Sequence, residues 1–130
     1  MKTIKVLIMA VFLSSVNAGA QSADAMKVAY KWAECSAGMQ YLLELDPNNP
    51  FSKVMNNMSK KFMLASMVMY KSKGHTKDSI IVRMTGAISD KTDYYDAMFS
   101  IGKGLDILKK DISRCEVKQF PIVEELLKSI

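Results

Sequence analysis

Apolar side chains recur every three or four residues through most of this sequence, and no other feature limits its possible folds so strongly. Over residues 22–45 and again over residues 76–116, this spacing keeps the apolar positions on one face of a helix. No stretch of useful length alternates between apolar and polar residues, as a half-buried β-strand would. The sequence therefore predicts an all-α fold.

Proline, glycine and capping residues divide the pattern into helices. We predict a first helix over residues 22–45, with Ser22 as its N-cap and a proline-rich stop at residues 46–50. A second helix is expected to begin at once, with Asn49 as N-cap and Pro50 in the first helical position, and to end near Gly74. Thr76 or Asp78 can then open a third helix.

The polar cluster at residues 89–93 decides how the second half of the chain divides. The apolar phase alone would allow one helix of about forty residues, but this cluster is rich in N-cap residues and favours a break. We therefore predict a separate fourth helix over residues 92–116, weakened by Gly102 and Gly104. A short amphipathic helix over residues 122–130 completes a small up-and-down bundle of about four main helices.

The first twenty residues have the order of a cleavable secretory signal. Lys2 and Lys5 precede an apolar run over residues 6–13, which is far shorter than the roughly 20 residues needed to span a bilayer. Small residues at 18 and 20 predict cleavage before Gln21, with cleavage after residue 18 as the alternative. We expect residues 1–20 to be the signal peptide and residues 21–130 to form one soluble α-helical domain, periplasmic or secreted.

The only two cysteines, Cys35 and Cys115, both lie in the part predicted to be exported. In an oxidising compartment, an even pair of cysteines typically forms a structural disulfide. Closing a loop of about 80 residues stabilises a fold by roughly 4 to 5 kcal/mol in the chain-entropy model. We therefore predict a Cys35–Cys115 bridge from the first helix to the end of the fourth.

No catalytic, metal or cofactor motif is recognisable. His75 is the single histidine, and it lies in a polar linker, where we expect it to be solvated. Acidic pairs such as Asp93 with Asp96 fit the start or the polar face of a helix better than acid–base catalysis. Without Lys2 and Lys5 the net charge falls from +5 to +3, and the basic residues form no stripe suited to nucleic acid. We expect a protein that is not an enzyme and holds no metal or cofactor.

The second helix carries an unusual segment, because residues 62–70 are apolar all the way round. Such a segment is either the covered central helix of a bundle or a surface for another molecule. Methionine suits both roles, since its flexible side chain fills core gaps and adapts to varied partners. The candidate partner-binding residues are Phe62, Met63, Met67, Met69 and Tyr70.

These features predict an exported, non-catalytic protein-binding module of the bacterial envelope, of the inhibitor, regulator or chaperone type. Its partner would be an unidentified envelope or secreted protein, and neither nucleic acid nor a membrane span is expected. The alternative is a carrier for a small apolar ligand. That function requires a pocket inside the bundle, lined by Met63, Met67, Met98 and Phe99.

Overall fold

The computed structural model describes the backbone of residues 18–130 and the side chains of residues 24–130. Within that part the chain forms helices and no strand. The helices are α2 (Ala18–Leu45), α3 (Ser52–Ser72), α4 (Lys77–Ser100), α5 (Gly104–Arg114) and α6 (Phe120–Lys128), with a π-helical turn, η1 (Cys115–Gln119), between the last two. The prediction of an all-α bundle is confirmed. The predicted signal peptide lies outside the described residues, except that residues 18–20 open α2.

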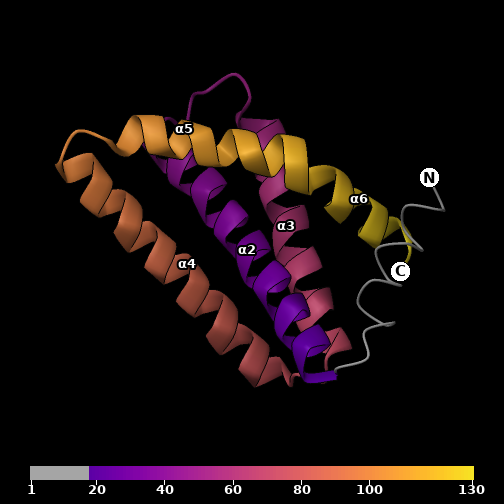
Figure 1. Cartoon of the computed structure of the whole chain (residues 1–130). Coiled ribbons are helices and arrows are strands. Elements are labelled where there is room, and N and C mark those ends of the chain that lie inside the picture. The colour runs from indigo at the N-terminus through magenta and orange to yellow at the C-terminus, as the bar shows by residue number, and fades with distance from the viewer. Residues whose placement is uncertain (1–17) are drawn as a thin grey trace.

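Helix α2 is the centre of the bundle. Figure 1 shows α3 and α4 on either side of it, with α2, α3 and α4 alternating in direction. The continuous segment α5–η1–α6 then crosses α2 near Cys35 and α3 near Phe62. Because α2 packs against α3, α4, α5 and η1, it is the central helix, whereas α3 packs against α2, α4 and α6 and leaves one side exposed.

Small residues on α2 explain its central position. Ala29, Ala33 and Ser36 are almost fully buried and let α3 approach closely. The two buried hydroxyls of Ser36 and Ser59 share a hydrogen bond of 2.7 Å across this interface. Further along the interface, the Ser66 hydroxyl donates to the carbonyl oxygen of Ala29 at 2.6 Å. Each buried hydroxyl is thus paired, so the close packing leaves these polar groups satisfied.

The boundaries of the first helices differ in detail from the predicted ones. Ser22 is not an N-cap, because α2 already begins at Ala18. Asn49 does not cap α3 either, since its side chain accepts the backbone N–H of Phe51 in the preceding turn and α3 begins at Ser52. Thr76 does cap α4 as predicted, its hydroxyl accepting the N–H of Ser79 at 3.2 Å.

The predicted break at residues 89–93 is wrong. Helix α4 runs through this cluster to Ser100, because the polar side chains that form bonds here do so with other helices or with a carbonyl of α4 itself and displace no helical N–H bond. Thr92, for example, donates its hydroxyl to the carbonyl of Ile88 without interrupting the helix. The break lies at residues 101–103, where Gly102 adopts a positive φ of 77°. The predicted fourth helix over residues 92–116 is therefore divided: residues 92–100 belong to α4, and α5 begins at Gly104.

The chain also stays helical through Pro121, between the predicted fourth helix and the predicted short helix over residues 122–130. The π turn η1 precedes the proline, and the N–H of Phe120 donates to the carbonyl of Cys115, five residues earlier. A proline has no N–H to offer, so a turn with wider spacing just before it lets the helix continue. The result places Cys115 and Gln119 together against α2.

No helix in residues 18–130 has both the length and the apolar character needed to cross a membrane.

Candidate functional site

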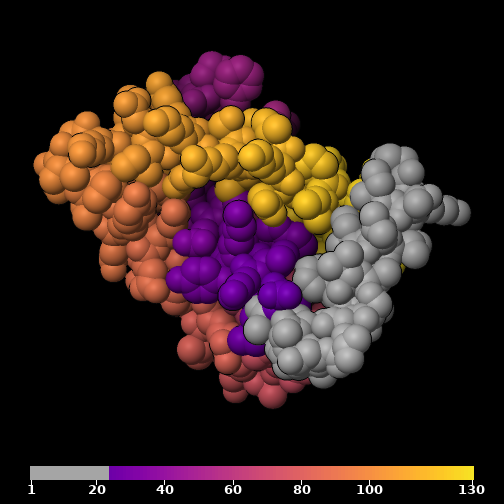
Figure 2. Space-filling view, viewed as in Figure 1, coloured from indigo at the N-terminus to yellow at the C-terminus, as the bar shows by residue number. Residues whose placement is uncertain are grey.

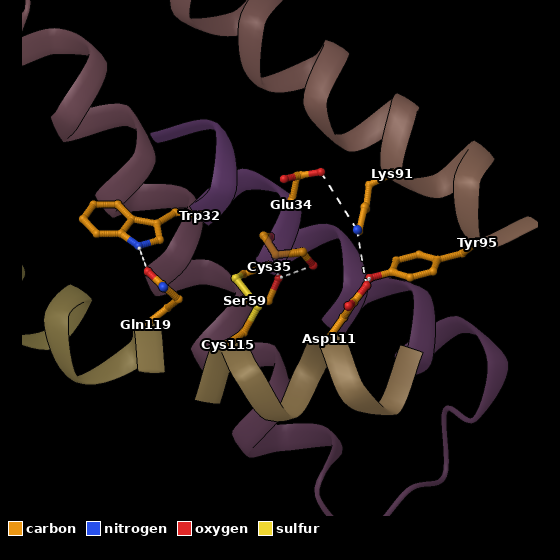
Figure 3. Close-up of a disulfide and its surroundings, with 10 residues drawn as sticks. Trp32, Glu34, Cys35, Ser59, Lys91, Tyr95, Asp111, Cys115 and Gln119 are labelled. Carbon is orange, nitrogen blue, oxygen red and sulfur yellow. Dashed lines mark hydrogen bonds and ion pairs between the residues drawn. A yellow bond between two sulfur atoms is a disulfide. The ribbon is translucent and has the colours of Figure 1, made fainter. Parts of the chain in front are cut away.

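Cys35 and Cys115 form the predicted disulfide, with their Cα atoms 5.8 Å apart. Figure 3 shows the bridge joining the middle of α2 to the start of η1. Trp32, one turn earlier on α2, is fully buried and donates its indole N–H to the side-chain oxygen of Gln119 at 3.1 Å. The bridge and this hydrogen bond together hold the C-terminal segment on the central helix.

Beside the bridge lies a hollow of about 180 Å³ between α2, α4 and α5. Figure 2 shows the surface of α2 recessed between these neighbours. Lys91 projects into the hollow from α4, and its ammonium nitrogen lies 3.2 Å from a carboxylate oxygen of Asp111 and 4.0 Å from one of Glu34. The same Asp111 oxygen accepts the hydroxyl of Tyr95 at 2.8 Å (Figure 3). These four side chains connect three helices through one polar cluster.

The cluster changes the acidity of two of its members. Burial raises the pKa of Glu34, and the nearby Lys91 ammonium opposes this shift. Burial raises the pKa of Tyr95 as well, and the hydrogen bond to Asp111 adds to it because ionisation would place two negative charges together. Tyr95 therefore remains a neutral donor, and the Lys91 ammonium is shared between two carboxylates. This arrangement suits a structural connection between helices.

The second hollow is a groove of about 460 Å³ between the end of α3 and the start of α4. Its apolar lining comes from both helices: Leu64, Met67, Val68, Ile80 and Ile81. Lys71, His75 and Lys77 complete the lining from the helix ends and the connector. Three of the apolar side chains are about half exposed, namely Leu64 at 46%, Met67 at 45% and Ile81 at 52%. The groove is thus open to solvent along its length.

The structure divides the five candidate partner-binding residues into two groups. Phe62, Met69 and Tyr70 are almost fully buried and belong to the core that packs on α2 and its neighbours. Met63 and Met67 are exposed on the outer side of α3, and Met67 lines the groove. Only these two are placed to touch another molecule, so partner contact remains a prediction for Met63 and Met67.

His75 lies in the connector, as predicted, but it is not simply solvated. Its ring makes a T-shaped contact with the buried Tyr70 ring, with 5.4 Å between the centroids, and its Nδ1 lies 3.1 Å from the hydroxyl of Ser79. The side chain is half-buried at one end of the groove. Within residues 24–130, no three His, Cys, Asp or Glu side chains gather as a metal site would require.

Sequence reasoning missed two groups of residues at these sites. Leu64, Lys71 and Met67 share a face of α3 at steps of three and four, so their spacing could have shown the wall of the groove. Ile81 carries no such signal, because its position opposite α3 depends on how the two helices pack. The Lys91 cluster was equally invisible, since its members lie on three separate helices.

The proposed ligand pocket inside the bundle would have brought Met63 and Met67 together with Met98 and Phe99. Met98 and Phe99 line neither of the two hollows described above. They lie at the far end of α4, where the Phe99 ring stacks on that of Tyr41 at 5.6 Å between centroids. Met67 alone of the four lines the groove.

Fold and sites define this chain as a disulfide-linked, all-α bundle with one charged hollow and one open apolar groove. No protein-family model matches it, and neither does a curated protein or a solved structure.

Proposed function

We propose that this protein is an exported, non-catalytic binding module of the bacterial envelope, acting as an inhibitor, regulator or chaperone through contact with another protein. The groove between α3 and α4 is its contact site. The observation that carries the proposal is the half-exposed state of Leu64, Met67 and Ile81 on facing walls of one groove. Apolar patches of this kind, bordered by polar residues, are typical of interaction surfaces.

The position of α3 supports this reading of the groove. The central helix of the bundle is α2, so the outer side chains of α3 are not needed to fill the core. Open grooves between helices are used in proteins to hold an amphipathic helix, whose apolar side chains at positions i, i+3, i+4 and i+7 enter the groove. We therefore infer that the occupant is a helical segment of another protein.

Export is the second component of the proposal. Disulfides persist in oxidising compartments, and the Cys35–Cys115 bridge fits an extracytoplasmic protein. Intact mass of the protein purified from producing cells, with and without reductant and alkylation, tests this component. We expect a chain that begins at Gln21 and is two hydrogens lighter than its reduced form. An uncleaved chain, or one with two free thiols, would contradict export.

Site-specific photo-crosslinking tests the contact. A photoreactive phenylalanine analogue replaces Met67 in the groove or, as the control, Val117, which is also exposed but lies on η1. In cells that produce the protein, we expect discrete crosslinked products from position 67 and none of the same size from position 117. Equal products from both positions, or none from either, would contradict the proposal.

A carrier for a small apolar ligand is the second candidate, and the volume of the groove favours it. About 460 Å³ falls within the range of roughly 300 to 1,000 Å³ that ligand pockets occupy. Such pockets, however, bury most of their ligand, and walls that are half exposed cannot do so. Native mass spectrometry distinguishes the two functions, because a carrier purified under mild conditions retains a small-molecule adduct that Met67→Glu removes.

A further inference from the structure

Apart from His75, lysine is the only acidic or basic residue type between Asp46 and Asp78, in the segment that contributes the α3 side of the groove. Residues 47–77, which include all of α3 and the connector to α4, contain six lysines and not one aspartate or glutamate. The other residues from 21 to 130 contain 10 basic and 13 acidic side chains. The positive charge of the predicted mature chain is therefore concentrated on α3 and its connector.

Two of these lysines line the apolar groove, and a third shares the face of α3 that forms its wall. Lys71 and Lys77 belong to its lining, at the end of α3 and the start of α4. Lys60 precedes Leu64 by one turn, on the face of α3 that continues through Leu64 and Met67. The apolar lining is thus bordered by ammonium groups along α3 and at the connector, and no carboxylate contributes to it.

Ion pairs within the chain leave these charges uncompensated. Of the six lysines, Lys61 alone forms an ion pair among the described side chains, with Glu124 of α6 at 3.4 Å. Lys60, Lys71 and Lys77 are exposed and have no carboxylate within ion-pair distance in that part of the structure. An incoming acidic group can therefore pair with them without displacing an existing partner, and charges so placed favour complementary molecules and accelerate their approach.

We propose that the occupant of the groove is an acidic amphipathic helix of a partner protein, an inference that rests on the proposed function. Its apolar stripe packs on Leu64, Met67 and Ile81, and its flanking carboxylates pair with Lys60, Lys71 and Lys77. A concave groove between two helices suits a helix better than a flat lipid surface. Single-stranded nucleic acid is typically held by aromatic side chains on which its bases stack, and His75 is the only ring in the lining.

Fluorescence anisotropy with designed peptides tests this inference on the oxidised chain. The acidic probe is a capped helical peptide with leucine at positions i, i+3, i+4 and i+7 and glutamate on its remaining face. The basic probe replaces every glutamate by lysine. We expect the acidic probe to bind at least about 10-fold more tightly, which corresponds to about 1.4 kcal/mol, and to weaken as salt is raised.

Charge reversal gives the sharper comparison. Lys71→Glu with Lys77→Glu should invert the preference, so that the basic probe binds more tightly. Lys109→Glu with Lys110→Glu is the matched control, because these lysines are exposed on α5, away from the groove, and should leave the preference unchanged. Circular dichroism of each variant confirms that these exposed substitutions leave the fold intact.

The outcomes separate the two proposals. If both probes bind equally and Met67→Glu abolishes both, the groove binds helices but the partner is not acidic, and only the present inference fails. If neither probe binds, the groove is not a helix site and the proposed function fails too.

Binding only to vesicles containing phosphatidylglycerol would assign the surface to lipid. Self-association lost in the double lysine variant would assign it to a second copy of the chain. Either result overturns the inference.

Discussion

Gly38 determines how the residues of the bridge hollow meet. A β-carbon at this position would lie 3.0 Å from the hydroxyl oxygen of Tyr95, which is closer than side chains normally approach. Without that atom, the Tyr95 ring passes over α2 and its hydroxyl reaches Asp111 on α5. A glycine inside α2 weakens the helix intrinsically, but here it permits the contact that connects α4 to α5.

Removal of the Tyr95 hydroxyl should therefore destabilise the fold. Tyr95→Phe loses a hydrogen bond to a carboxylate, which is worth about 1.5 to 3 kcal/mol. Urea denaturation followed by circular dichroism measures the change. Tyr94→Phe is the control, because Tyr94 is exposed and its hydroxyl makes no hydrogen bond among the described residues. If the two variants are equally stable, the Tyr95–Asp111 bond contributes nothing.

Replacing the Glu34 carboxylate, in contrast, should stabilise the fold at neutral pH. Because burial raises its pKa in the folded state, the protonated form is favoured by folding, and that contribution is lost as pH rises through the raised pKa. Glu34→Gln keeps the neutral form at every pH. It should increase the free energy of unfolding at pH 7, by less than about 1 kcal/mol because the side chain is partly solvated. The gain should disappear below the unfolded-state pKa of 4.5.

Urea denaturation of Glu34→Gln and the parent chain at pH 4 and pH 7 provides this comparison. A variant that is less stable than the parent at pH 7 would show that the contact with Lys91 outweighs burial.

Among the elements, the connection between α4 and α5 shows how a helix boundary is chosen. Polar residues at 89–93 have capping side chains, yet the helix passes through them. Gly102 ends the helical path because its positive φ of 77° turns the backbone, a conformation that other residues adopt only at a cost. Gly104 follows directly, in close contact with the ring of Phe99, where a β-carbon would clash.

Two glycine substitutions should consequently act in opposite directions. Gly102→Ala forces a β-carbon into the left-handed region and should destabilise the fold by about 1 to 2 kcal/mol. Gly86→Ala lies inside α4 with no atom within 4 Å of the added carbon, and it should stabilise by up to about 1 kcal/mol. Thermal unfolding of both variants measures the two changes in stability. A stabilising Gly102→Ala would mean that the break between α4 and α5 does not depend on this glycine.

Across the whole molecule, the disulfide joins parts of the chain that are 80 residues apart. It holds the segment α5–η1–α6 across α2 at the point where Trp32 meets Gln119. Replacing both cysteines by serine should reduce the free energy of unfolding by roughly 4 to 5 kcal/mol, since the unfolded chain regains the entropy of a long loop. Denaturation of the double variant and of the reduced parent chain should agree. A loss below about 1 kcal/mol would contradict this account.

Short-range chemistry was enough to predict much of the fold. The helical period is a property of neighbouring residues, and so are the proline stop after α2, the threonine cap of α4 and the glycine after α3. With only two cysteines, Cys35 and Cys115 had a single possible pairing. The α3 side of the groove, with Met67 on its surface, could also be predicted in part, because its residues follow the helical spacing within one segment.

Long-range packing decided the rest. The sequence could not show whether the apolar segment at residues 62–70 was covered, because coverage depends on which helix occupies the centre. Small residues on α2 gave that position to α2, which left Met63 and Met67 exposed while Phe62 became buried. The polar cluster around Lys91 and the apposition of Ile81 to Met67 likewise arise only when separate helices meet. Neither contact has a periodicity or a spacing within one segment that could reveal it.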